Sequence, residues 1–229
     1  MNLSFISLSI YLALSQCYFS DPLEYKNEDF EIKSVKVSHD AQLGLSIWEI
    51  SVNGKAGKTT PRPAGQLNGA PVLGYVFPTN LSSTDVGFGK TEGIVALALT
   101  SHPDFDDTPL WDENQDQKYD NDGIVWHPHW VVLQKDERIK GGLSVKQFDQ
   151  DDPTVVLPPT NPGMPMYMDS PGYPVKTNGN TIQVIVPDYR WNVNKDLKFD
   201  GVAAYMQVNT EDPNKPLLGV YEVYSIASG

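Results

Sequence analysis

The sequence has one cysteine, few basic residues and no long uninterrupted apolar run. Because Cys17 stands alone, it has no partner for an intramolecular disulfide bond, and packing or bound ions must stabilise the fold. There are 17 Lys and Arg residues against 29 Asp and Glu residues, a formal net charge of -12. Binding phosphates needs a cationic surface, so this charge argues against nucleic acid as a partner and favours cations.

The first residues contain an apolar run from Phe5 to Leu14, which is too short to span a bilayer as a helix. Its length is typical of the core of a signal peptide. We therefore predict that residues 1–17 form a signal peptide and that the protein is secreted or periplasmic. In the alternative interpretation, the segment ending at Cys17 is a lipoprotein signal and Cys17 carries a lipid anchor. We expect no membrane span.

Residues 18–229 show no sustained helical stripe, whereas runs of β-branched and aromatic residues alternate with turn-forming residues. This pattern predicts a single all-β domain, an antiparallel β-sandwich of the immunoglobulin-like or jelly-roll-like kind, with long, ion-ordered loops. The predicted strands are Glu31–Val37, Leu45–Val52, Val72–Phe77, Ile94–Thr100, Ile124–Leu133, Leu143–Phe148, Thr181–Val186, Val202–Val208 and Leu217–Tyr224.

A strongly acidic segment precedes the fifth predicted strand, with eight acidic residues and one lysine between Asp104 and Asp122. Within it, potential oxygen ligands recur at every second residue: Asp112, Asn114, Asp116, Lys118 and Asp120. The spacing resembles the ligand register of an EF-hand loop, which implies a structural calcium ion bound by these residues, by the backbone carbonyl of Lys118 and by Asp122. Gln117 stands where that family has glycine. The alternative is a solvated acidic loop.

Two histidines, His127 and His129, follow on either side of Pro128. On an extended strand they share one face, about 7 Å apart, which suits two ligands of one metal ion. Because proline lacks the backbone N–H, we expect an edge strand or a bulge here. The spacing resembles that of cupins, but the acidic residue and the second histidine motif of that family are missing. Two structural histidines are the alternative, and His39 and His102 are further candidate ligands.

Three of the five methionines form the short series Met164, Met166 and Met168. An extended chain would place their thioethers on one face, and thioethers together with imidazoles select copper, above all Cu(I). The series resembles the methionine-rich segments of extracytoplasmic copper-handling proteins. That resemblance implies a copper site shared with His127 and His129. Methionines also fill gaps in cores or cover adaptable binding surfaces, which is the alternative interpretation.

These observations predict an exported metal-binding protein, with structural calcium in the acidic loop and copper at a His/Met site for storage, delivery or sensing. One alternative is a calcium-stabilised carbohydrate-binding or adhesion module, in which aromatic side chains stack on sugars. The candidates for that role are Trp111, Trp126, Trp130, Tyr167 and Tyr173. A haem-binding sandwich or a glycosidase-type enzyme is a second alternative. Hydrolase and dinucleotide-binding motifs are missing, so a binding protein is favoured over an enzyme.

Overall fold

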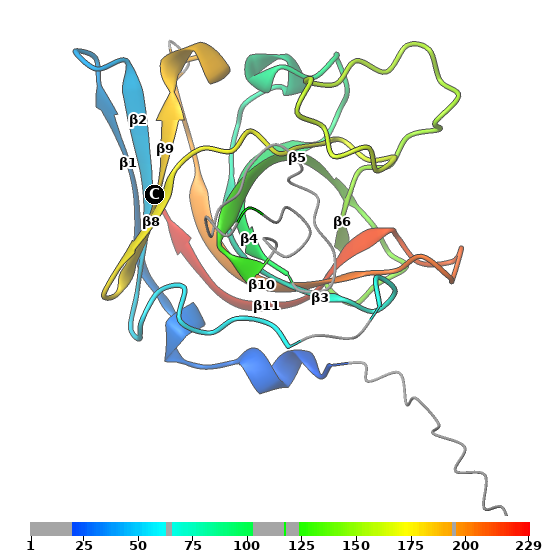
Figure 1. Cartoon of the computed structure of the whole chain (residues 1–229), viewed down its shortest axis with the longest axis horizontal. Coiled ribbons are helices and arrows are strands. Elements are labelled where there is room, and N and C mark those ends of the chain that lie inside the picture. Colours follow the sequence, from blue (N-terminus) through cyan, green and yellow to red (C-terminus); the bar gives the residue numbers. More distant parts are fainter. Residues whose placement is uncertain (1–19, 63–65, 103–116, 118–123, 194–195) are drawn as a thin grey trace, which may run out of the picture.

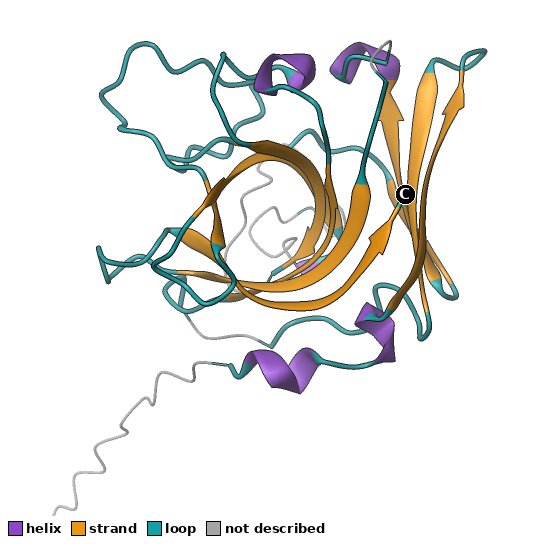
Figure 2. Cartoon of the chain, turned by 180° about the vertical axis from the view of Figure 1, so that it is seen from behind, coloured by secondary structure: helices purple, strands orange, loops and turns teal. Residues whose placement is uncertain are grey.

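The computed structural model describes residues 20–62, 66–102, 117, 124–193 and 196–229. These residues form antiparallel β-sheets connected by loops and short 3-10 turns (Figure 2). In the described residues, no helix is long and apolar enough to cross a membrane. The predicted signal peptide and the predicted calcium ligands, Asp112, Asn114, Asp116, Lys118, Asp120 and Asp122, lie outside the described residues.

The strands of the described residues are spread along the sequence from Ile32 to Ser228. The strands are β1 (Ile32–Asp40), β2 (Leu45–Val52), β3 (Pro71–Pro78), β4 (Ile94–Ser101), β5 (His127–Lys135), β6 (Leu143–Val145), β7 (Met168–Asp169), β8 (Val175–Asn178), β9 (Thr181–Pro187), β10 (Asp200–Val208) and β11 (Leu218–Ser228). The 3-10 turns are η1 (Pro22–Tyr25), η2 (Glu28–Phe30), η3 (Ser83–Val86) and η5 (Asp188–Arg190).

The larger sheet closes on itself. Its strand order is β4-β3-β10-β11-β6-β5, and β5 pairs back with β4, so the described strands form a closed six-stranded barrel (Figure 1). The short strand β7 adds to β5 beside this ring, where Met168 lies opposite Val131. In the β4–β5 pair, Thr100 lies opposite His127 and Ala98 opposite His129. This register determines which side chains meet inside the barrel.

The smaller sheet has the order β1-β2-β9-β8 and lies beside the barrel (Figure 1). Alternate residues of β2 and β9 are buried, as expected for strands with one solvent face. Their side chains pack against the outer face of the barrel in a cluster that we call the interlayer core. It is rich in aromatic rings, including Phe30, Trp48, Tyr75, Phe77, Trp126, Trp130 and Tyr205.

The barrel strands send alternate residues to the interlayer core and to the barrel interior. On β3, Tyr75 and Phe77 face the interlayer core, whereas Val76 faces inward. The neighbouring Gly74 has no side chain, and an added Cβ would lie 2.6 Å from the terminal methyl carbon of Met206. Glycine at this position therefore leaves room for a methionine from the adjacent strand β10.

The structure confirms the predicted all-β, antiparallel class. Each of the nine predicted strands appears, and the bounds of Leu45–Val52 match those of β2. Two strands were missed: β7 has only two residues, and β8 is largely exposed and polar. The immunoglobulin-like or jelly-roll-like arrangement is not confirmed, because the larger sheet is a closed barrel. Alternation along a strand shows which face is buried, but it does not show whether the sheet curls until its edges meet.

Candidate metal centre

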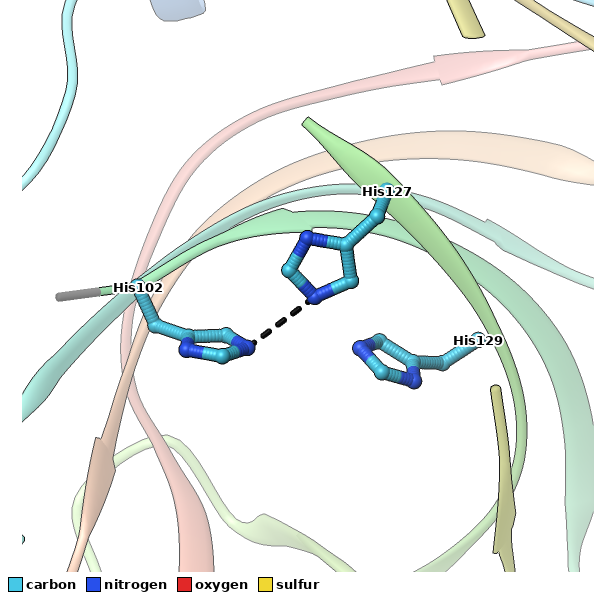
Figure 3. Close-up of side chains that lie close together, drawn as sticks. All are labelled: His102, His127 and His129. Atoms are coloured by element: carbon cyan, nitrogen blue, oxygen red, sulfur yellow. Dashed lines mark hydrogen bonds between the residues drawn. The ribbon is translucent and has the colours of Figure 1, made fainter. Parts of the chain in front are cut away.

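Three buried histidines meet inside the barrel. His102 directly follows β4, while His127 and His129 both lie on β5, and the three rings point toward one another (Figure 3). Each offers one ligand atom, and these atoms all lie within 4.8 Å of one another. The three residues are 1–2% exposed. This is a compact cluster of nitrogen ligands shielded from bulk solvent.

The strand register explains why a residue distant in sequence joins the pair. Thr100 lies opposite His127 in the β4–β5 ladder, and His102 lies two residues further along, on the same face as Thr100. The Nε2 atoms of His102 and His127 are 3.0 Å apart. The ring centroid of His127 lies 4.7 Å from that of His102 and 4.8 Å from that of His129. The central ring of the cluster is thus His127.

Hydrogen bonds orient two of the rings. Nδ1 of His127 lies 2.7 Å from the carbonyl oxygen of Val125. A carbonyl only accepts, so this Nδ1 carries the hydrogen, and the Nε2 lone pair faces His102. In this arrangement Nε2 of His102 donates. On the other side, Nδ1 of His129 lies 3.0 Å from Oγ of Ser170. Metal-binding histidines usually have such a partner on the second ring nitrogen.

The close approach of the rings also limits their charge. Three imidazolium ions with nitrogens within 4.8 Å would repel one another strongly in a buried site. Neutral imidazoles avoid this repulsion, and the neutral form is the one that binds metal ions. The geometry therefore suits either a hydrogen-bonded neutral cluster or a bound cation.

Ser170 is held in place by its neighbour Asp169. Asp169 is fully buried and accepts hydrogen bonds from Thr160 and from the guanidinium of Arg190, whose Nη2 lies 2.9 Å away. Burial raises the pKa of Asp169, and the bonds from Thr160 and Arg190 oppose this shift. Because Asp169 pairs with Trp130 in the β5–β7 ladder, this network fixes β7, which ends directly before Ser170, to the strand that carries His129.

The predicted methionine series lies along the wall of the same barrel. Met164, Met166 and Met168 line a cavity together with His102 and His129, so the prediction that the three share one face holds. Met166 and Met168 are buried in an apolar cluster, and Tyr167 points the opposite way, into the interlayer core. The structure brings the methionines and histidines into one barrel. Ligation by sulfur remains a prediction.

The strand that carries the histidine pair is an edge only in part. Pro128 lies opposite Leu99 of β4. On its other side β5 pairs with β7 from Trp130 and with β6 from Leu133, so in the described part of the chain only β4 accompanies Pro128. Val132, four residues along the same strand, forms its backbone bonds to Tyr167 and Lys146, away from β4. By the alternation of the ladder, the missing N–H of Pro128 would also point away from β4, so the proline interrupts no described ladder bond. The remaining histidine, His39, lies at the surface, with Nε2 2.8 Å from Asp188.

The aromatic residues proposed to stack on sugars are mostly buried. Trp126, Trp130, Tyr167 and Tyr173 are at most 8% exposed. The indole N–H of Trp126 donates to the carbonyl of Gly57, and that of Trp130 to the hydroxyl of Tyr173. Four of the five candidates therefore belong to the core and offer no exposed ring. Trp111 lies outside the described residues.

Comparisons with protein-family models, curated proteins and solved structures found no match to this chain. The site must therefore be interpreted from its own geometry. From the sequence, His102 is only a further candidate ligand, because the sequence does not show that its side chain points to the same side of the sheet as His127 and His129. The signal that identifies it is structural: the antiparallel register of β4 and β5.

Proposed function

We propose that this protein binds a transition metal ion through His102, His127 and His129, with copper as the expected metal. The observation that supports the proposal is the convergence of three buried imidazole nitrogens within 4.8 Å on two hydrogen-bonded strands. Imidazole nitrogens bind zinc at about 2.0–2.1 Å, so the ligands of one ion must converge as these three do. Three protein ligands leave a further coordination position open.

The choice of copper rests on the donor atoms. Imidazole accepts zinc, copper, nickel and iron, and among divalent ions copper binds such sites most tightly. The thioethers of Met166 and Met168 face the same barrel interior and favour Cu(I). We propose storage, delivery or sensing of copper rather than catalysis.

Copper retention tests the proposal. Protein stripped with a chelator is dialysed against limiting copper, and the metal is then quantified per chain. We expect about one copper ion in the unchanged protein and a large loss in His102→Ala, His127→Ala and His129→Ala. His39→Ala is the matched control, because this histidine is exposed and pairs with Asp188. Failure of the unchanged protein to retain copper would overturn the proposal, as would equal retention by all variants.

Two further parts of the account are separate proposals. We propose that residues 1–17 direct export, which amino-terminal sequencing of the exported chain tests. We also propose that the acidic loop binds structural calcium. Calcium should then raise the melting temperature of the protein, and Asp116→Asn together with Asp120→Asn should abolish the rise. An identical melting temperature with calcium and with chelator would contradict the calcium proposal without affecting the histidine site.

A further inference from the structure

The barrel holds a cavity of about 80 Å³ beside the histidine cluster. All six barrel strands contribute to its lining, and His102 and His129 form part of its wall. The cavity is therefore a feature of the barrel as a whole. It is distinct from the spaces between loops on the surface.

The cavity exists because small residues occupy inner positions of the barrel. Small barrels are ordinarily filled by their inward side chains. Here Ala98 and Ala204 line the interior, and Gly74, which pairs with Ala204 on one side and Thr100 on the other, contributes no side chain. Larger side chains at these positions would close the space. The sequence instead places its bulky aromatic residues on the outer face of the same strands.

The lining is apolar except near the metal centre. None of the residues lining it in the described part of the chain is Lys, Arg, Asp or Glu, and its polar members are Thr100, His102 and His129. Methionines are unusually frequent: Met164, Met166, Met168 and Met206 all contribute. Methionine side chains are flexible and polarizable, so they adapt to the shape of a ligand. Apolar cavities in proteins stay dry and take up small apolar molecules.

We propose that this cavity binds a small uncharged apolar molecule, held by the valine and methionine side chains with one end beside His102 and His129. The inference goes beyond the proposed function, because apolar uptake needs no metal ion. Its position nevertheless gives it a consequence for the metal site. A molecule in the cavity would lie beside His102 and His129, two of the three proposed metal ligands.

Xenon is a suitable probe, since it enters dry apolar cavities without a polar partner. Chelator-stripped protein is titrated with xenon, and uptake is followed by xenon NMR. We expect saturable uptake of about one xenon atom per chain, weakened about tenfold or more by Ala204→Leu, which fills the space. Ala204→Val should give a smaller loss and serves if the leucine variant does not fold. Ala41→Leu adds the same atoms at an exposed turn and should change nothing.

The outcomes separate this proposal from the metal proposal. His127 does not line the cavity, so His127→Ala should lose copper and keep xenon uptake. Unsaturable uptake by the unchanged protein would overturn the cavity proposal, as would xenon uptake by both Ala204 variants equal to that of the unchanged protein. If the unchanged protein binds xenon but retains no copper, the metal proposal fails and the cavity proposal stands. If it retains copper but takes up no xenon, the cavity proposal fails and the metal proposal stands.

Discussion

The two faces of the barrel strands differ sharply in what they carry. On β3 the outward Tyr75 and Phe77 are fully buried in the interlayer core, whereas the inward Val76 lines the barrel cavity. On β5 the outward Trp130 packs in the interlayer core, and His129 beside it faces the histidine cluster. Alternate residues of one strand thus belong to the packed core and to the candidate metal site. The comparison implies that the two properties can be changed separately.

The largest expected effect is the loss of stability when a side chain that packs against the outer face of the barrel is removed. Trp48 of β2 is fully buried and makes edge contacts with Phe77 and Trp130, with ring centroids 5.4 and 5.8 Å away. Replacement by alanine leaves a cavity, so Trp48→Ala should lower the free energy of unfolding by about 3–5 kcal/mol, measured by urea denaturation. Copper retention at low temperature should persist. A loss of copper with unchanged stability would contradict the division between the faces.

A substitution on the inner face should lower copper affinity more than it lowers stability. His102→Ala removes one of the three proposed ligands, and we expect the copper affinity to fall at least about 100-fold, measured by competition with a chelator of known affinity. The metal-free variant should lose less unfolding free energy than Trp48→Ala does. His39→Ala is again the control. A copper affinity unchanged by loss of His102 would show that the ion, if bound, lies elsewhere.

A smaller effect on copper affinity is expected at Ser170, which contacts His129. Oγ of Ser170 lies 3.0 Å from Nδ1 of His129, and the residue is 1% exposed. Ser170→Ala removes the group that orients this ring, so the copper affinity should fall by about 10–100-fold. The exposed Ser34 of β1 offers a control, since Ser34→Ala removes the same atom far from the barrel interior. Equal affinities in both variants would mean that Ser170 does not position His129.

The smallest effect is expected at the charged pair of Asp136 and Arg138, directly after β5. Hydrogen bonds from the guanidinium of Arg138 lower the pKa of Asp136 to about 2. A carboxyl with a lowered pKa stabilises the fold above its ordinary pKa near 3.8, and this stabilisation is lost as pH falls from about 4 to 2. Because Arg138 is partly exposed, screening reduces the gain, and Asp136→Asn should cost about 1–2 kcal/mol at pH 7.

Urea denaturation at pH 7 and at pH 2.5 checks this prediction. The stability difference between the unchanged protein and Asp136→Asn should shrink at the lower pH, where the native carboxyl begins to protonate. Glu137→Gln, at the exposed neighbouring position, should show little difference at either pH. A difference that is constant with pH would indicate that packing, not charge, explains the effect of Asp136→Asn.

Much of the fold could be predicted from the sequence because strand signals are local. The alternation in Leu45–Val52 gives both the strand and its buried face, and the same rule correctly placed His127 and His129 on one face. Closure of the barrel could not be predicted, because it depends on β5 pairing back with β4 across a long connection. The two-residue β7 depends on tertiary pairing alone.

The candidate site was predicted in part for a similar reason. His102 and His127 are 25 residues apart, and only the register of two strands brings their Nε2 atoms together. The local sequence pattern does not show whether the tryptophans beside the histidine pair are exposed or buried, since indole has both apolar and polar parts. The structure places Trp126 and Trp130 in the interlayer core, which removes them from any sugar-binding surface.

The most direct test of the account is X-ray absorption spectroscopy of the copper-loaded protein. Three converging imidazoles predict outer-shell scattering from three histidine rings, with nitrogen atoms at about 2.0 Å from the metal, and a reduced ring count in His127→Ala. Sulfur scattering would add one of the methionines to the site. A spectrum with fewer than three imidazoles, or one identical in His127→Ala, would contradict the claim that the inner face of the barrel holds the metal.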